Sequence, residues 1–345
     1  MSEIVPLVPV HDSSSPAGPD RSASRHLPRR ITCGAISLLM SAYIADAVTA
    51  DVLTLNSDPS IAGPTAEQLS CRGSKGVMIT EAGTGLQASD FMRNMMAPTM
   101  NAEGICIGAL HEGRTSRADM NARAIGNFAL SLEREGPVDV ILFADSEGGM
   151  GIPTQVKIIR EEFGTKVRVA AAIWNATPNG REDLKKADNR LYVDNYDFPY
   201  GRGVVLATNI IGEWREGAGV LDTKTYYDAW QNMTKTGVLL TKSQLKNIYD
   251  GFPEVTDVDE LRNADGSLPD FHYIYATTDD TIEEPQAVEG IQAKIPVTIT
   301  IEVIETDEPF MHAKEWLADK YHIYEPTIRR MAEGVSARID SRKAA

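Results

Sequence analysis

The sequence predicts an α/β fold built on a parallel sheet. Two apolar runs of strand length, Val138 to Ala144 and Val167 to Ile173, are almost continuously hydrophobic. Such runs are typical of strands in a parallel sheet that is covered on both faces. Residues 152–163 between them favour a helix, because Pro153 suits a first helical turn and Gly164 suits a left-handed helix end. This order is a strand, a crossover helix and a parallel strand.

Further elements alternate in the same way over Ile31 to Thr208. Val52 to Leu55 and Val77 to Thr80 are short apolar strands, and 117–134 has an amphipathic helical face. Nearer the end of the chain, two more strands are predicted, Phe271 to Thr277 and Ile295 to Ile304.

The composition is that of a soluble globular protein. The 345 residues are 42% hydrophobic and 24% charged, which is enough chain for two sizeable cores. The net charge of -15 argues against nucleic acid as a main partner. No apolar run is long enough to span a membrane. The three cysteines lack the spacing of a metal site and are sparse, so we expect a reducing compartment, the cytoplasm.

Three successive predicted strands end in polar or glycine-rich loops. The loops are Asn56 to Asp58, Thr80 to Asp90, and Ser146 to Gly151. In a parallel sheet they emerge along one edge, where open α/β sheets bind ligands. Backbone N–H groups of glycines and a helix N-terminus make an anion site there. A glycine cluster after a strand, taken alone, is at least as often a tight turn.

The order of these loops resembles that of the tubulin/FtsZ superfamily, and most of all its phage tubulin-like (PhuZ-type) members. In that family a strand ends in an N-T-D-like turn, a later loop reads roughly T-x-G-x-G-A-G-G, and a third reads G-G-G-T/A-G-S/T. Here LNSD (Leu55 to Asp58), TEAGTGLQASD (Thr80 to Asp90) and SEGGMG (Ser146 to Gly151) stand in that order. The resemblance covers Ile31 to Asn209.

The resemblance implies a cytoskeletal protein that binds GTP or GDP, with Mg²⁺ as a companion ion. Such a protein polymerises head to tail with copies of itself, and hydrolysis is completed across the subunit contact. It implies a cytoplasmic location, in the infected host cell if a phage encodes the chain. It identifies no catalytic residue. The implied nucleotide-binding residues are Gly34, Asn56, Asp58, Ala82, Gly83, Thr84, Gly85, Ser146, Gly148, Gly149, Met150, Gly151 and Tyr226.

The chain departs from the family at two of these loops. In the first loop, 33–40, only Gly34 is kept, and Glu147 stands where the signature loop has its first glycine. A carboxylate beside phosphates costs on the order of a few kcal/mol unless a cation intervenes, so Glu147 either turns outward or lowers nucleotide affinity. The alternative function is therefore a protein of the same fold with a degenerate site, acting in structure or assembly without GTPase activity. A dinucleotide enzyme is less supported, because no G-x-G-x-x-G turn and no acid/base constellation is evident.

This interpretation divides the chain into five parts. They are 1–29 as a flexible leader, 30–221 as a Rossmann-like GTP-binding domain, 222–242 as a central helix and loop, 243–326 as a smaller α+β domain, and 327–345 as a basic helical tail. Pro326 is expected to end one helix before the tail. A basic terminal helix is usually a solvated end, although this one could dock on an acidic neighbouring subunit.

Two late histidines could suggest a metal site. His312 and His322 lie in the predicted last helical region with Glu315 and Asp319 between them. Helical spacing does not bring the two histidines onto one turn, so ordinary surface residues are the better interpretation.

Overall fold

The computed structural model describes residues 60–63, 71–83, 89–111, 118–185, 190, 193–194, 242–309, 311–313, 315 and 319–344. Several predictions from the sequence lie outside these residues. They are the leader 1–29, the strand 52–55, the central helix at 223–234, and the site residues Gly34, Asn56, Asp58, Thr84, Gly85 and Tyr226.

The described strands form one seven-stranded sheet in the order β1-β3-β2-β4-β5-β6-β7. All neighbouring strands are parallel except β1, which pairs antiparallel with β3. An α/β fold with a parallel sheet is therefore confirmed. The strands are β1 Ser60–Ala62, β2 Gly76–Glu81, β3 Ile105–His111, β4 Val138–Asp145, β5 Val167–Asn175, β6 Asp270–Ala276 and β7 Ile299–Ile304.

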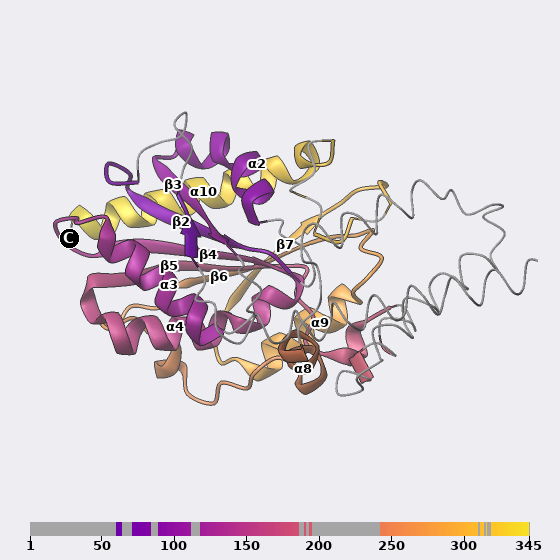
Figure 1. The fold of residues 1–345 in the computed structure, drawn as a ribbon. Helices are drawn as coiled ribbons and strands as arrows, with labels where there is room; N and C mark the ends of the chain where they lie inside the picture. Colours follow the sequence, from indigo (N-terminus) through magenta and orange to yellow (C-terminus); the bar gives the residue numbers. More distant parts are fainter. Residues whose placement is uncertain are drawn as a thin grey trace, which may run out of the picture.

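Helices cover both faces of this sheet (Figure 1). Helices α2 (Ser89–Ala102) and α10 (Tyr321–Ala344) lie on one face. The other face carries α3 (Ala118–Ser131), α4 (Ile152–Ile158), α8 (Lys242–Asp250) and α9 (Glu284–Lys294). Within the described residues, no helix has both the length and the apolar character needed to cross a membrane. Short helices complete the fold: the 3-10 helices η1 Ser146–Gly151, η3 Gly164–Lys166, η4 Arg181–Asp183 and η5 Val258–Leu261, and the π-helix η2 Ile159–Phe163.

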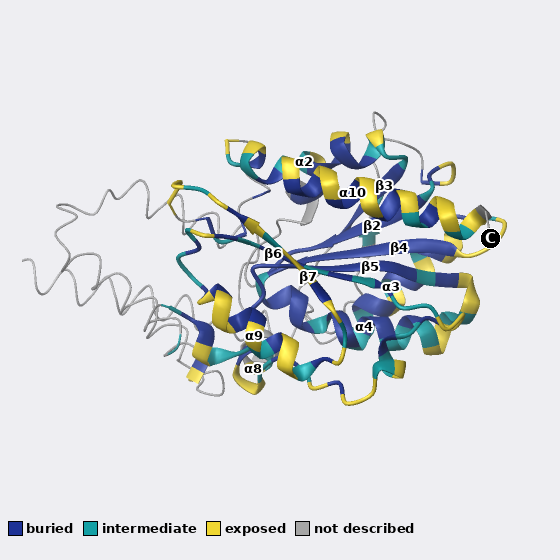
Figure 2. Ribbon diagram, turned by 180° about the vertical axis from the view of Figure 1, so that it is seen from behind, coloured by how far each residue is buried: buried dark blue, intermediate teal, exposed yellow. Residues whose placement is uncertain are grey.

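The crossover between β4 and β5 follows the sequence closely. Every residue of β4 is buried, as its apolar run predicts (Figure 2). Alternate β4 side chains enter the two cores: Val140 packs on the α3 and α4 side, and Ile141 on the α2 and α10 side. Gly164 ends the crossover with a positive φ of 57°, which glycine adopts without strain.

The second predicted domain is not separate in the described residues. Strands β6 and β7, predicted to belong to an α+β domain at 243–326, extend the first sheet instead. β6 pairs with β5 in parallel from Ala171 with Asp270 to Asn175 with Ile274. The short apolar strands allowed either arrangement, because period and length do not specify the partner strand.

The basic tail belongs to the core. Helix α10 is continuous through Pro326, where the sequence predicted a break. Pro326 is the sixth residue of the helix, so the helix lacks one backbone hydrogen bond in its second turn. Ile328, Val335 and Ile339 of this helix are buried, and the helix packs on α2 and the sheet. Its apolar face is therefore covered by this chain.

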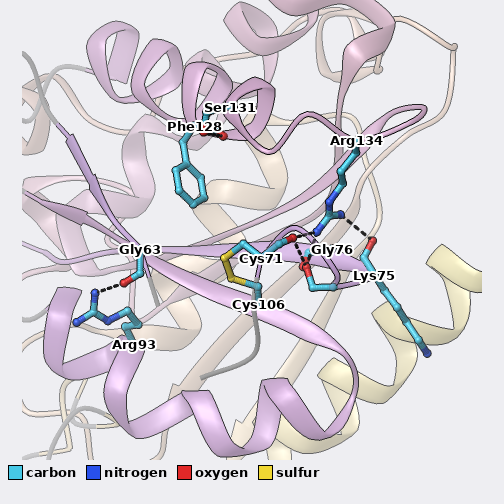
Figure 3. The surroundings of a disulfide bond; sticks show 10 residues. Gly63, Cys71, Lys75, Gly76, Arg93, Cys106, Phe128, Ser131 and Arg134 are labelled. Carbon is cyan, nitrogen blue, oxygen red and sulfur yellow. Dashed lines mark hydrogen bonds between the residues drawn. A yellow bond between two sulfur atoms is a disulfide. The ribbon is translucent and has the colours of Figure 1, made fainter. Parts of the chain in front are cut away.

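Cys71 and Cys106 form a disulfide that joins the turn before β2 to β3 (Figure 3). Arg134 lies beside it and donates hydrogen bonds to the backbone carbonyls of Cys71 and Lys75. The contact ties the end of α3 to the amino end of the sheet, opposite the loops in which the sequence predicted a site. A disulfide was not expected from three sparse cysteines, so this pairing differs from the prediction. The cellular location stays a prediction.

Candidate active site

Ser146 lies in the turn that follows the central strand, β4. It follows the last residue of β4 and begins η1, and its φ is 48°. A positive φ is uncommon for a residue with a side chain, and such strained residues occur often at functional sites. Because β4 lies between β2 and β5 in the middle of the sheet, this turn projects the serine from the centre of the carboxyl edge.

A histidine and an aspartate extend from Ser146 in one hydrogen-bonded line. The Nε2 atom of His312 lies 3.0 Å from Ser146 Oγ. The Nδ1 atom of the same ring lies 2.7 Å from Asp279 Oδ2. The imidazole side chain is 15% exposed and the aspartate side chain 1%. This is the order nucleophile, base and orienting acid that acyl-transfer enzymes use.

The three residues come from three loops at the same edge of the sheet. Ser146 follows β4, Asp279 follows β6, and His312 follows β7. Backbone hydrogen bonds hold the last two loops together: Thr277 N donates to Ile304 O at 3.0 Å, and Met311 N donates to Thr278 O at 3.4 Å. The line of side chains is thus fixed by the order of the strands.

Asp279 is held as an anion. Its Oδ1 accepts hydrogen bonds from the backbone N–H groups of Thr281 at 2.7 Å and Ile282 at 2.8 Å. Burial raises the pKa of Asp279, but the nearby His312 and these donors more than offset burial and lower it to about 2. The carboxylate therefore stays charged over the working range of a hydrolytic enzyme and fixes the Nδ1 hydrogen of the imidazole.

The glycines around Ser146 allow close packing of the backbone. A Cβ on Gly83 would lie 2.6 Å from Ser146 Cβ. One on Gly148 would lie 2.8 Å from Ala82 O, and one on Gly149 would lie 2.1 Å from Thr177 Oγ1. Gly83 and Gly148 let the loop after β2 and the turn after β4 touch, and Gly149 lets that turn approach the end of β5. Steric packing therefore accounts for the absence of a Cβ at these three positions.

We expect Gly149→Ala to lower the free energy of unfolding by about 1–3 kcal/mol, the usual effect of overpacking. The added methyl group would also meet Trp174 Cδ1 at 2.8 Å, and Thr177 is fully buried. Gly334→Ala is the matched control. Gly334 is exposed on α10 with nothing within 4 Å, so alanine there should add up to about 1 kcal/mol of stability. Urea unfolding of both variants measures this, and equal effects would contradict the packing argument.

Glu147 is turned inward, so the first of the two expectations, an outward orientation, is wrong. It is 3% exposed, and its Oε1 accepts a hydrogen bond from Asn247 Nδ2 of α8 at 3.0 Å. Burial raises the pKa of Glu147 to about 8, with the nearby Glu81 adding to the rise and the Asn247 hydrogen bond opposing it. The side chain is thus a protonated acid at neutral pH and adds no negative charge next to Ser146.

Because the pKa of Glu147 is raised in the folded state, the free energy of unfolding should depend on pH. The folded state keeps this proton up to about pH 8, whereas the unfolded chain releases it near its ordinary value of 4.5. Stability should therefore fall by about 1.4 kcal/mol per pH unit between these values. Glu147→Gln keeps the acceptor for Asn247 and removes the proton, so it should flatten this slope. Urea unfolding at pH 5 and 7.5 measures both slopes, and identical slopes would contradict the prediction.

Three further buried acids lie beneath the turn and hold it in place. Glu81, at the end of β2, accepts hydrogen bonds from Asn121 at 2.7 Å and Gln155 at 2.6 Å, which join α3 and α4 to the strand. On the other side, Asn175 Nδ2 donates to Asp145 Oδ1 at 2.9 Å and to Glu315 Oε2 at 2.7 Å. These amide donors fix both ends of the segment that carries Ser146.

Among the described residues, one group has the spacing of a metal site. Ligand atoms of Asp279, Glu284 and His312 lie within 4.8 Å of one another. Two of these residues already form the line that begins at Ser146, and the Nδ1 to Oδ2 distance of 2.7 Å is that of a direct hydrogen bond. The geometry fits a hydrogen-bonded set of side chains.

The structure brings part of the sequence-predicted site together. The described residues of the predicted site lie at the carboxyl ends of β2 and β4, but only Ser146 among them takes part in the hydrogen-bonded line with His312 and Asp279. His312, predicted to be an ordinary surface residue, is in the site, and no sequence pattern points to Asp279. The described members of the predicted site are Ala82, Gly83, Ser146, Gly148, Gly149, Met150 and Gly151.

The fold is similar to that of solved α/β hydrolases. A hydrolase from Oleispira antarctica aligns with a TM-score of 0.50 at 11% identity, covering 82% of this chain and 97% of that one. A protein assigned as an aryl esterase from Burkholderia cenocepacia aligns with a TM-score of 0.50 at 13% identity, covering 81% and 94%. No protein-family model matches the sequence. No curated protein matches it either. The similarity establishes the α/β hydrolase fold alone.

This similarity overturns the tubulin/FtsZ interpretation. The neighbours have the α/β hydrolase fold, so the prediction of a GTP-binding filament protein is wrong. The alternative of a degenerate structural protein of the tubulin fold is wrong as well, and so are GTP, GDP and Mg²⁺ as cofactors. The loop order that suggested tubulin arises in any parallel sheet whose strands end in polar and glycine-rich loops.

Proposed function

We propose that this protein is a serine hydrolase that cleaves carboxylic esters through a covalent acyl-serine. One observation carries the proposal: Ser146, strained at a φ of 48°, contacts His312 Nε2 at 3.0 Å, and that ring contacts Asp279 at 2.7 Å. The α/β hydrolase fold supports it, because the three loops follow strands in the chain order serine, acid and histidine that this fold uses.

The reaction follows from the geometry. His312 Nε2 takes the hydroxyl proton as Ser146 Oγ attacks the ester carbonyl, and a tetrahedral oxyanion forms. The imidazolium then protonates the leaving alcohol, and the acyl group stays on the serine. Water, deprotonated by the same imidazole, attacks the acyl-enzyme and releases the acid. Asp279 stabilises the positive charge that the ring gains in both halves.

The oxyanion needs hydrogen-bond donors that are in place before the reaction. We propose the backbone N–H of Glu147, the residue after the nucleophile, and that of Gly83. A Cβ on Gly83 would lie 2.6 Å from Ser146 Cβ, so its backbone is next to the reacting atom. Protonated Glu147 leaves no carboxylate charge beside the developing oxyanion.

A labelling experiment tests the proposal. The protein is treated with a fluorophosphonate, digested, and analysed by mass spectrometry, and its hydrolysis of p-nitrophenyl esters of increasing acyl length is measured. We expect covalent modification at Ser146 and turnover of at least one ester. An unlabelled Ser146 together with no ester turnover would overturn the assignment.

A further inference from the structure

Glu284, the first residue of α9, is a buried acid that the proposed reaction does not use. It is 2% exposed. Its carboxyl group lies beside that of Asp279, and oxygen atoms of both, with a ring nitrogen of His312, lie within 4.8 Å of one another. Two carboxylates so close in a water-poor site do not both ionise. One of the two therefore holds a proton.

Counting hydrogen atoms indicates which one. Tyr273 Oη lies 2.5 Å from the backbone carbonyl of Thr177 and 2.7 Å from Glu284 Oε2. A carbonyl only accepts, and a tyrosine hydroxyl has one hydrogen to donate. If that hydrogen goes to Thr177 O, the second contact needs a hydrogen from Glu284. If Glu284 were ionised, one of the two oxygen–oxygen contacts of Tyr273 would have no hydrogen atom between its oxygens and would be repulsive.

The surroundings of Asp279 agree with this assignment. Both of its oxygens accept hydrogen bonds, from the N–H groups of Thr281 and Ile282 and from His312, as an anion requires. Glu284 has no such set of donors: its Oε1 has no hydrogen-bond donor among the described residues. Burial and the negative charge of Asp279 both raise the pKa of Glu284 well above its ordinary value.

We propose that Glu284 is a positioning residue of the triad formed by Ser146, His312 and Asp279. It is a neutral carboxylic acid that lies against Asp279 and leaves Asp279 as the only anion behind His312. This inference rests on the proposed function. The proton of Glu284 is on Oε2 and is donated to Tyr273 Oη, so this contact anchors Glu284 to β6 while its neutral carboxyl group lies beside Asp279. The titratable groups that face this site are Tyr273 on β6, Asp279 and His312 on the loops after β6 and β7, Lys185 after η4, and Asp183 within η4.

Infrared spectroscopy tests the proton directly and needs no activity. Spectra of the wild-type protein and of Glu284→Gln are compared at neutral pH in D₂O. We expect the variant to lose a carbonyl band of a protonated carboxylic acid. The control Glu289→Gln, exposed on the same helix, should lose carboxylate bands instead. Loss of carboxylate bands in Glu284→Gln would overturn the proposal, whatever the protein hydrolyses.

The pH profile of kcat/KM for an ester tests the positioning role. Glutamine is neutral and keeps a donor, so Glu284→Gln should keep its activity within about threefold and its acid-limb midpoint within about 0.3 pH unit. Glu284→Leu replaces the polar carboxyl group beside Asp279 with an apolar side chain, so the charge of Asp279 is less well solvated and holds the imidazolium more strongly. We expect the midpoint to rise by about 0.5–1 pH unit.

Each other outcome has a definite meaning. A midpoint that falls by about one pH unit in Glu284→Gln would show that an anion was removed, and the proposal would be wrong. A midpoint unchanged in Glu284→Leu, with only a lower melting temperature, would show a structural role alone and would also overturn it. If no variant or wild-type protein hydrolyses any ester, the proposed function fails, and the infrared result still decides the protonation of Glu284.

Discussion

Replacing Ser146 with alanine is expected to lower kcat for ester hydrolysis by about 10⁶-fold, to the residual rate that binding and the oxyanion donors sustain. The hydroxyl is the only group of this side chain that reacts, and no other described serine has a histidine ring nitrogen within hydrogen-bond distance of its Oγ. The variant should also lose fluorophosphonate labelling. Initial rates with p-nitrophenyl esters and intact-mass measurement check both effects.

The Ser146→Ala variant should fold normally. Alanine and serine carry the same Cβ, so the strain of a φ of 48° is already present in the wild-type protein. Ser131→Ala is the matched control, because Ser131 is exposed and its hydroxyl contacts only the carbonyl of Phe128, at 2.7 Å. A Ser146→Ala protein that is folded and still hydrolyses esters at more than about a tenth of the wild-type rate would contradict a serine nucleophile.

The parallel sheet could be predicted because its signals are local. The apolar runs of β4 and β5 and the stop at Gly164 depend on neighbouring residues only, and the structure confirms them. The partner of each strand is a different kind of information. Nothing near Asp270 or Ile299 specifies that β6 and β7 extend the same sheet, so this part was assigned to another domain.

The nucleophile had a local signal that was interpreted differently. Ser146 follows a buried strand and has the small residues Ala144 and Gly148 two positions away on either side. This is close to the G-x-S-x-G turn of α/β hydrolases, with alanine in place of the first glycine. The two glycines after Glu147 favoured a phosphate loop instead, and their close contacts became visible only when β2 was placed beside β4.

The other two members of the triad had no local signal. His312 is 166 residues from Ser146 along the chain, and Asp279 is 33 residues from His312. His312 was expected within the last helix, but α10 begins at Tyr321, and the histidine lies in the loop before it. The strand order brings the three loops together, so these residues follow from topology rather than from pattern.

Replacing Asp279 with asparagine should lower kcat by about 10⁴-fold, as it does in triads of this type when the imidazole takes the wrong tautomer. Oδ1 of Asp279 accepts from two backbone N–H groups, so the amide oxygen of asparagine must occupy that position. Its NH₂ group then faces His312 Nδ1 and donates to it. The ring hydrogen moves to Nε2, where it points at Ser146 Oγ and prevents the ring from taking the hydroxyl proton.

The size and kind of this loss separate the tautomer effect from a loss of structure. Asp307→Asn is the control, since Asp307 is an exposed acid in the segment between β7 and His312 and should leave kcat unchanged. Asp279→Asn should bind a non-hydrolysable ester analogue with nearly the wild-type affinity, because Asp279 contacts His312 rather than substrate. A kcat within about tenfold of wild type would show that the imidazole does not need this carboxylate. Ser146, His312 and Asp279 would then not act together as a catalytic triad.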